Sequence, residues 1–157
     1  MGALRNLIEA VYPPHCLACA EVVGSDGALC PSCWRDATFL DGTLCDTCGA
    51  PLPGEADGGP LTCDDCLATP RPWSAGRAAL SYSGTGRRLA LSLKNADRTD
   101  LPAAAALWMA RAGRALLAGQ PLLAPVPLHW VRLFRRRYNQ SALLSAALAR
   151  AEGLDHC

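Results

Sequence analysis

The sequence CLACAEVVGSDGALCPSC, residues 16–33, decides the fold of the first part of this chain, and CDTCGAPLPGEADGGPLTCDDC, residues 45–66, repeats its pattern. Each stretch begins and ends with two cysteines separated by two residues. Such a pair places two thiolates on one tight turn, and two turns together supply the four sulfur ligands of tetrahedral zinc. The expected metal ligands are Cys16, Cys19, Cys30, Cys33, Cys45, Cys48, Cys63 and Cys66.

Sulfur ligands without histidine suit zinc or, less often, an iron–sulfur cluster, and regular CxxC pairs favour zinc. Consecutive pairing closes the shortest loops and costs the least chain entropy, so we expect one zinc within residues 16–33 and a second within residues 45–66. Interleaved pairing is the alternative. Four protein ligands leave no position for water. We therefore expect two structural zinc ions and assign no catalytic residue.

A disulfide framework is the main alternative to metal, and it requires an oxidising compartment and a secretory signal. The N-terminal sequence MGALRNLIEAVYPP contains no long apolar segment before Cys16, which predicts a cytoplasmic location with reduced thiols. A thioredoxin-like redox site would use one CxxC pair, not a series. No apolar run reaches membrane-spanning length, so we expect no membrane insertion.

Charge is divided unevenly along the chain. Residues 1–70 contain two arginines and ten carboxylates, whereas residues 71–157 contain thirteen basic and four acidic groups. A zinc ribbon that binds nucleic acid needs basic side chains against the phosphates, so the acidic ribbons are not expected to bind it. Their charge either serves solubility, which is the simpler interpretation, or docks against the basic half. Any anion or nucleic-acid site is expected after residue 70.

Apolar periodicity and turn residues divide the chain into three parts: a short helix in residues 1–12, a double zinc ribbon of small β-hairpins in residues 13–70, and a second domain in residues 71–157. The ribbons have too little apolar sequence for a core, so metal binding must supply their folding energy.

Strands and helices alternate in the second domain, which predicts a parallel α/β arrangement with Trp108 in the core. Ligands of such sheets bind beyond the carboxyl ends of the strands. The expected elements are a strand over 76–82, helices over 86–94 and 101–119, a buried strand over 122–128, a basic loop over 129–140 and a helix over 141–153.

The predicted basic loop is the second candidate site. Its arginines lie between a strand and a helix N-terminus, which suits a phosphate or pyrophosphate, although a solvated basic face has the same composition. Aromatic residues alternate with the arginines, and we expect them to anchor the loop; stacking on nucleic-acid bases is the alternative. The arginines are Arg132, Arg135, Arg136 and Arg137, and the aromatic residues are Trp130, Phe134 and Tyr138.

The order of YPPHCLAC, CGAPLP, SLK and PVPLHWVRLFRRRYNQ resembles the ComF family, competence-associated bacterial proteins that join zinc ribbons to a type I phosphoribosyltransferase-like domain. The resemblance implies a small α+β double ribbon followed by an incomplete parallel α/β phosphoribosyltransferase-like domain. It also implies phosphoribosyl pyrophosphate, or a related phosphorylated sugar, as ligand, with magnesium where the domain is complete. The implied binding residues are Lys94, Arg132, Arg135, Arg136, Asn139 and Gln140.

The chain departs from the family in two places. Arg137 and Tyr138 stand where family members often carry glycine and phenylalanine, and a glycine there serves a positive φ angle. The family's acidic pair before a Thr/Ser-Gly loop is absent, because Asp64 and Asp65 lie inside the second ribbon.

We therefore expect the N-terminal portion of a protein linked to competence and DNA uptake, without transferase activity. An incomplete sheet would also expose an apolar face. The alternative is a binding module whose ribbons dock a competence protein and whose basic segment contacts single-stranded DNA.

Overall fold

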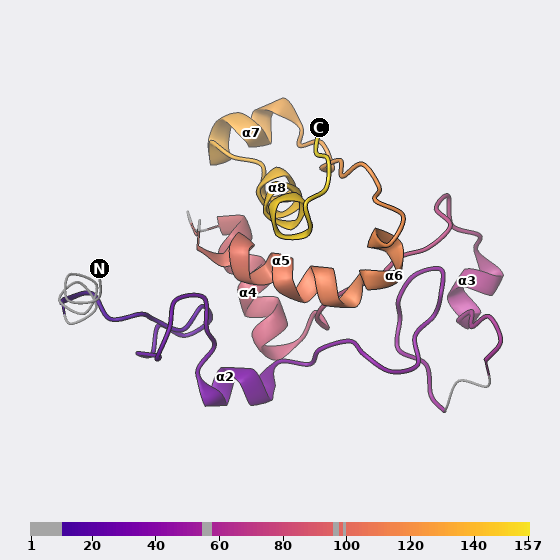
Figure 1. Ribbon diagram of the computed structural model, residues 1–157, viewed down its shortest axis with the longest axis horizontal. Helices are drawn as coiled ribbons and strands as arrows, with labels where there is room; N and C mark the ends of the chain where they lie inside the picture. Colours follow the sequence, from indigo (N-terminus) through magenta and orange to yellow (C-terminus); the bar gives the residue numbers. More distant parts are fainter. Residues whose placement is uncertain (1–10, 55–57, 96–97, 99) are drawn as a thin grey trace.

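The computed structural model describes residues 11–54, 58–95, 98 and 100–157 (Figure 1). The helix predicted within residues 1–12 lies, apart from its last two residues, outside this part. The described helices are α2 (Pro31–Asp36), α3 (Asp64–Ala68), α4 (Gly84–Asn95), α5 (Leu101–Ala112), α6 (Arg114–Leu117), α7 (Trp130–Arg136) and α8 (Gln140–Glu152). None of them is long and apolar enough to cross a membrane.

The two ribbons share one local design. The first CxxC pair of each lies in a turn closed by a single antiparallel bridge, His15 with Val22 and Leu44 with Pro51. The second pair begins a short helix, because Cys30 and Cys63 are the N-cap residues of α2 and α3. The predicted hairpins are therefore reduced to one bridge each, and a helical turn completes each ribbon.

The first ribbon and the helices share a hydrophobic core. Leu17, on the first CxxC turn and only 1% exposed, packs with Leu89 and Leu93 of α4 and with Leu101 and Ala104 of α5. Figure 1 shows α4 and α5 beside each other, with α8 packed over α5. The cysteine-rich and helical parts are thus joined by apolar packing as well as by the backbone.

Within the part of the chain that the structure describes, three ion pairs also connect the acidic and basic halves. Asp46 pairs with Arg77 at 3.0 Å, Asp36 with Arg88 at 3.1 Å, and Asp41 with Arg111 at 3.8 Å. Exposed pairs of this kind each add little stability, but together they select which surfaces meet. These contacts agree with the second interpretation of the acidic ribbons, in which their carboxylates dock against the basic half of the chain.

The helix predicted over residues 101–119 is interrupted at Gly113. This residue (φ −92°, ψ 9°) ends α5 and precedes α6, and its N–H donates to the carbonyl oxygen of Met109. Trp108 is half-buried, packs against the core and meets Phe39 edge to face at 5.7 Å between ring centroids. The expected core role of Trp108 is confirmed, whereas the prediction of a single helix over residues 101–119 is wrong.

Neither predicted strand forms as expected. Within residues 76–82 there is one antiparallel bridge, Leu80 with Phe39, and within residues 122–128 there is one parallel bridge, Leu123 with His156. Val126 is 73% exposed, not buried. A strand forms where a neighbouring strand pairs with its backbone groups. Among the described residues, each of these two segments makes a single bridge only. The parallel α/β sheet is therefore absent from the described part of the chain.

The basic segment is a helix and not the predicted loop. His129 begins α7 by accepting a hydrogen bond at Nδ1 from the N–H of Val131, and Arg137 ends it in the left-handed conformation with φ 61°. Asn139 then caps α8, whose first residue, Gln140, lies one position before the predicted start at residue 141. Gly153 closes that helix at φ 66°, as expected. The loop prediction is wrong: residues 130–136 contain no glycine or proline, and their leucine and arginines are good helix formers.

Candidate metal centres

The structure gathers the CxxC cysteines into two groups in the order of the sequence. Within each group the four sulfurs all lie within 4.8 Å of one another, and contacts of 3.6 Å join Sγ of Cys19 to that of Cys30 and Sγ of Cys48 to that of Cys63. The first centre consists of Cys16, Cys19, Cys30 and Cys33, and the second of Cys45, Cys48, Cys63 and Cys66. This grouping is the consecutive one.

Both centres have the dimensions of a tetrahedral zinc site. Zinc–sulfur bonds of about 2.3 Å place tetrahedral sulfurs about 3.8 Å apart, close to the cross-pair contacts above. Backbone amides also point at the sulfurs: Cys16 Sγ accepts from the N–H of Ala18 and of Cys30, and Cys45 Sγ accepts from that of Cys63. The two four-cysteine sites therefore fit two structural zinc ions, which would complete the fold and leave no open coordination position.

The acidities of the thiols point the same way. Burial by itself raises the pKa of Cys16, but amide donors led by Cys30 outweigh it and lower that pKa to about 6. The amide of Cys63 lowers the pKa of Cys45 to about 6 against the effect of burial. Burial, followed by the neighbouring sulfurs, raises the pKa of Cys33 to about 12. The sulfurs by themselves therefore combine acidic and weakly acidic thiols, and all four can be thiolate ligands together only where a cation such as a divalent metal offsets their charge.

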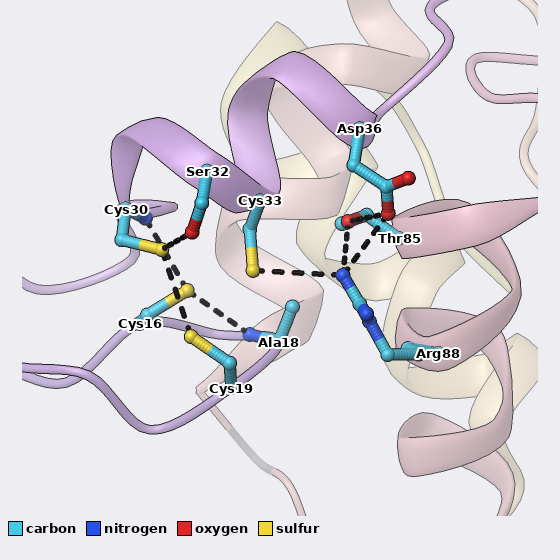
Figure 2. Close-up of polar contacts among 9 residues, drawn as sticks. All are labelled: Cys16, Ala18, Cys19, Cys30, Ser32, Cys33, Asp36, Thr85 and Arg88. Atoms are coloured by element: carbon cyan, nitrogen blue, oxygen red, sulfur yellow. Dashed lines mark hydrogen bonds and ion pairs between the residues drawn. The ribbon is translucent and has the colours of Figure 1, made fainter.

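Arginines from the second half of the chain contact both centres. Arg88 Nη2 lies 3.6 Å from Cys33 Sγ, 3.1 Å from Asp36 Oδ2 and 2.7 Å from Thr85 Oγ1 (Figure 2). A hydrogen bond to Cys66 is the main cause that raises the pKa of Arg71. Sequence reasoning missed both arginines, because nothing in the local sequence links a residue after position 70 to a particular cysteine.

The residues expected to bind a ligand have different surroundings in the structure. Asn139 is structural: its side chain accepts from the N–H of Ser141 and donates to the carbonyl oxygen of Val126. Gln140 has a buried Oε1 without a hydrogen-bond partner among the described residues. Of the remaining expected ligand residues, Lys94 and Arg132 are exposed and Arg136 is half-buried, while the side chain of Arg135 lies outside the described part.

The aromatic residues of this segment do not behave alike. Trp130 and Phe134, one turn apart on α7, are 74% and 86% exposed. Tyr138 instead donates from its hydroxyl to the carbonyl oxygen of Leu93 at 2.9 Å. The expected anchoring role is therefore confirmed for Tyr138 and wrong for Trp130 and Phe134, which face solvent beside the arginines.

Comparison with known families agrees with the cysteine geometry. Residues 7–67 match the family model of the double zinc ribbon domain. The N-terminal part of this chain is thus a double zinc ribbon domain.

Along most of its length, the chain is similar to curated bacterial proteins. It is 34% identical over 127 residues to the DNA utilization protein YhgH of Escherichia coli K12, which covers 78% of this chain and 54% of that protein. It is 32% identical over 144 residues to YhgH of Salmonella typhimurium LT2, covering 87% and 61%. The chain therefore spans about half the length of the curated relatives that it matches. No solved structure matches it.

Proposed function

We propose that this protein acts in DNA utilization and that α7 contacts single-stranded DNA, while the zinc ribbons provide the structural base for the helices. The similar proteins are named DNA utilization proteins, which supports a role with DNA. The observation that carries the proposal is the exposure of Trp130 and Phe134 beside arginines on the same short helix.

The aromatic residues of α7 have the spacing of one helix face. Side chains four positions apart lie on one face of a helix, so Trp130 and Phe134 present two adjacent aromatic surfaces. Stacking of a base on an aromatic side chain contributes about 1–3 kcal/mol and tolerates any sequence. Arg132, two positions from each aromatic residue, lies on another side of this short helix, where its exposed guanidinium can contact the phosphate backbone of a strand that passes around α7. The acidic ribbons would repel DNA and so confine binding to the second half.

Binding of a fluorescently labelled oligothymidine, followed by anisotropy at several salt concentrations, tests this proposal. We expect Phe134→Ala and Arg132→Ala each to weaken binding about tenfold, since a contact of about 1.4 kcal/mol is lost. Leu107→Ala and Arg150→Ala remove an exposed apolar and an exposed basic side chain elsewhere and should leave the affinity unchanged. Equal affinity for all four variants, or binding that ignores salt, would contradict a DNA contact at α7.

Phosphoribosyl pyrophosphate with magnesium is the second candidate ligand. Two observations favour it: Arg136 is half-buried just before the N-terminus of α8, and the buried amide oxygen of Gln140, in the first turn, has no hydrogen-bond partner among the described residues. The acidic pair Asp64 and Asp65 opens α3 between two cysteines of the second centre, so it is held away from this segment by its neighbours in sequence.

Calorimetry with phosphoribosyl pyrophosphate and magnesium tests the second candidate. Binding weakened by Arg136→Ala but not by Phe134→Ala would support the sugar phosphate over DNA. Because the carboxylates that would hold the ribose are not in place, we expect binding without cleavage, and released pyrophosphate would contradict the expectation of an inactive chain.

A further inference from the structure

The first metal centre has a contact with α4 that the zinc ribbon itself does not require. Arg88, in the second turn of α4, donates from Nη2 to Cys33 Sγ at 3.6 Å, across 55 positions of sequence. The same nitrogen donates to Asp36 Oδ2, the last residue of α2. Figure 2 shows the guanidinium between the sulfur and the carboxylate.

Thr85 completes this network from the first turn of α4. Its hydroxyl donates to Asp36 Oδ2 at 2.8 Å and accepts from Arg88 Nη2 at 2.7 Å. The side chain is 0% exposed, so both of its hydrogen bonds are shielded from water. The position of Arg88 is therefore held by partners on α2 and on α4, and its approach to Cys33 is not a chance rotamer of a free surface arginine.

The charge at the centre gives this contact a consequence. Four thiolates around one divalent zinc leave a net negative charge on the sulfurs, and Cys33, 3% exposed, receives little help from solvent. A guanidinium donor offsets that charge and orients the ligand. Loss of such an outer hydrogen bond typically costs 10–100-fold in metal affinity.

We propose that Arg88 is a positioning residue of the first metal centre, which holds Cys33 in place as a ligand and links zinc retention there to the packing of α4. The next residue along α4 is Leu89, which packs against Leu17 of the first CxxC turn in the shared core. Metal release from this centre therefore loosens the contact between α4 and the ribbon, whereas the second centre is independent of Arg88.

Zinc release from the purified 157-residue chain into a chromogenic chelator tests the proposal. We expect Arg88→Ala to release one of the two zinc equivalents about tenfold faster than the unmodified chain, with the other equivalent unchanged. Arg88→Lys keeps the charge without the planar fork, so its rate of zinc release should lie between those of Arg88→Ala and the unmodified chain. This variant replaces Arg88→Ala in the test if the alanine variant does not fold. Arg87→Ala removes an exposed arginine from the neighbouring position and should match the unmodified chain.

A second control separates positioning of the ligand from general destabilisation. Thr85→Val breaks the hydrogen bonds of Thr85 to Asp36 and Arg88 but removes no contact to sulfur. At equal loss of melting temperature, Arg88→Ala must release the first zinc faster than Thr85→Val. Equal release by these two variants, or acceleration of both zinc equivalents by Arg88→Ala, would overturn the proposal.

Discussion

The hydroxyl of Tyr138 donates a hydrogen bond of 2.9 Å to the carbonyl oxygen of Leu93, which joins the end of the basic segment to the last turn of α4. The final carbonyls of a helix have no partner within it, so this bond satisfies a group that would otherwise need water. The ComF resemblance implies a phenylalanine at this position, and the tyrosine hydroxyl gives this chain an additional tertiary contact.

Tyr138→Phe tests the value of that contact. We expect the free energy of unfolding to fall by about 1 kcal/mol, the usual net contribution of one hydrogen bond. Urea denaturation followed by circular dichroism measures it. Tyr82→Phe, at a 66% exposed position, serves as the control and should be neutral; a Tyr138→Phe variant as stable as the unmodified chain would show that the bond contributes nothing.

Arg137 occupies a conformation suited to glycine. Its φ of 61° lies in the left-handed region, where a side chain costs about 1–2 kcal/mol, and it stands at the C-cap of α7. Arg137→Gly should therefore raise the free energy of unfolding by a few tenths to about 1 kcal/mol, since glycine also loses more entropy on folding. Arg132→Gly, inside α7, should lower it instead. The same denaturation experiment checks both, and a loss of stability in Arg137→Gly would contradict this account of the turn.

Double cysteine variants distinguish consecutive from interleaved metal pairing. If the grouping in the structure is the grouping of the ligands, Cys16→Ser/Cys33→Ser should retain one zinc per chain, because both changes fall in one centre. Cys33→Ser/Cys48→Ser should retain none, because it damages both. Cys157→Ser, outside both groups, should retain two. Elemental analysis of each purified variant measures the content, and one zinc remaining in the Cys33/Cys48 variant would contradict consecutive pairing.

Arg77 connects the second ribbon to the segment before α4. Its guanidinium donates to the carbonyl oxygens of Cys45, Asp46 and Gly76 and pairs with the Asp46 carboxylate. Arg77→Ala removes one donor from each of these acceptors, although the carbonyl oxygen of Cys45 keeps the N–H of Gly49, and we expect a loss of about 1–2 kcal/mol in the free energy of unfolding. Arg114→Ala, exposed on α6, is the matched control. No difference between the two variants by denaturation would remove Arg77 from the interface.

Acid should weaken the same interface. The amide of Leu61 and then Arg77 lower the pKa of Asp46 below its ordinary value of 3.8. A carboxyl whose pKa is lowered by folding stabilises the folded state at higher pH, and that contribution is lost as the pH falls through its folded pKa. Nuclear magnetic resonance titration of the Asp46 carboxyl should give a midpoint below 3.8, and Arg77→Ala should raise it; an unchanged midpoint would contradict the pairing.

The amino-acid sequence by itself determined the features that depend on short separations along the chain. The spacing of each CxxC pair predicted the two metal centres, and Gly153 predicted the end of α8. Such features follow from the bonding of a few neighbouring residues, so they can be predicted without knowledge of distant contacts.

Only the tertiary structure decided what depends on residues far apart. Arg88 reaches Cys33, and Leu17 joins the core of α4 and α5, because folding brings separate segments together. The apolar run over residues 122–128 predicted a buried strand, but a strand forms where a neighbour pairs with its backbone, and here only Leu123 makes a bridge within the described residues. For the same reason Trp130 and Phe134 are exposed: hydrophobic spacing makes a face suitable for packing, and only a packed partner buries it.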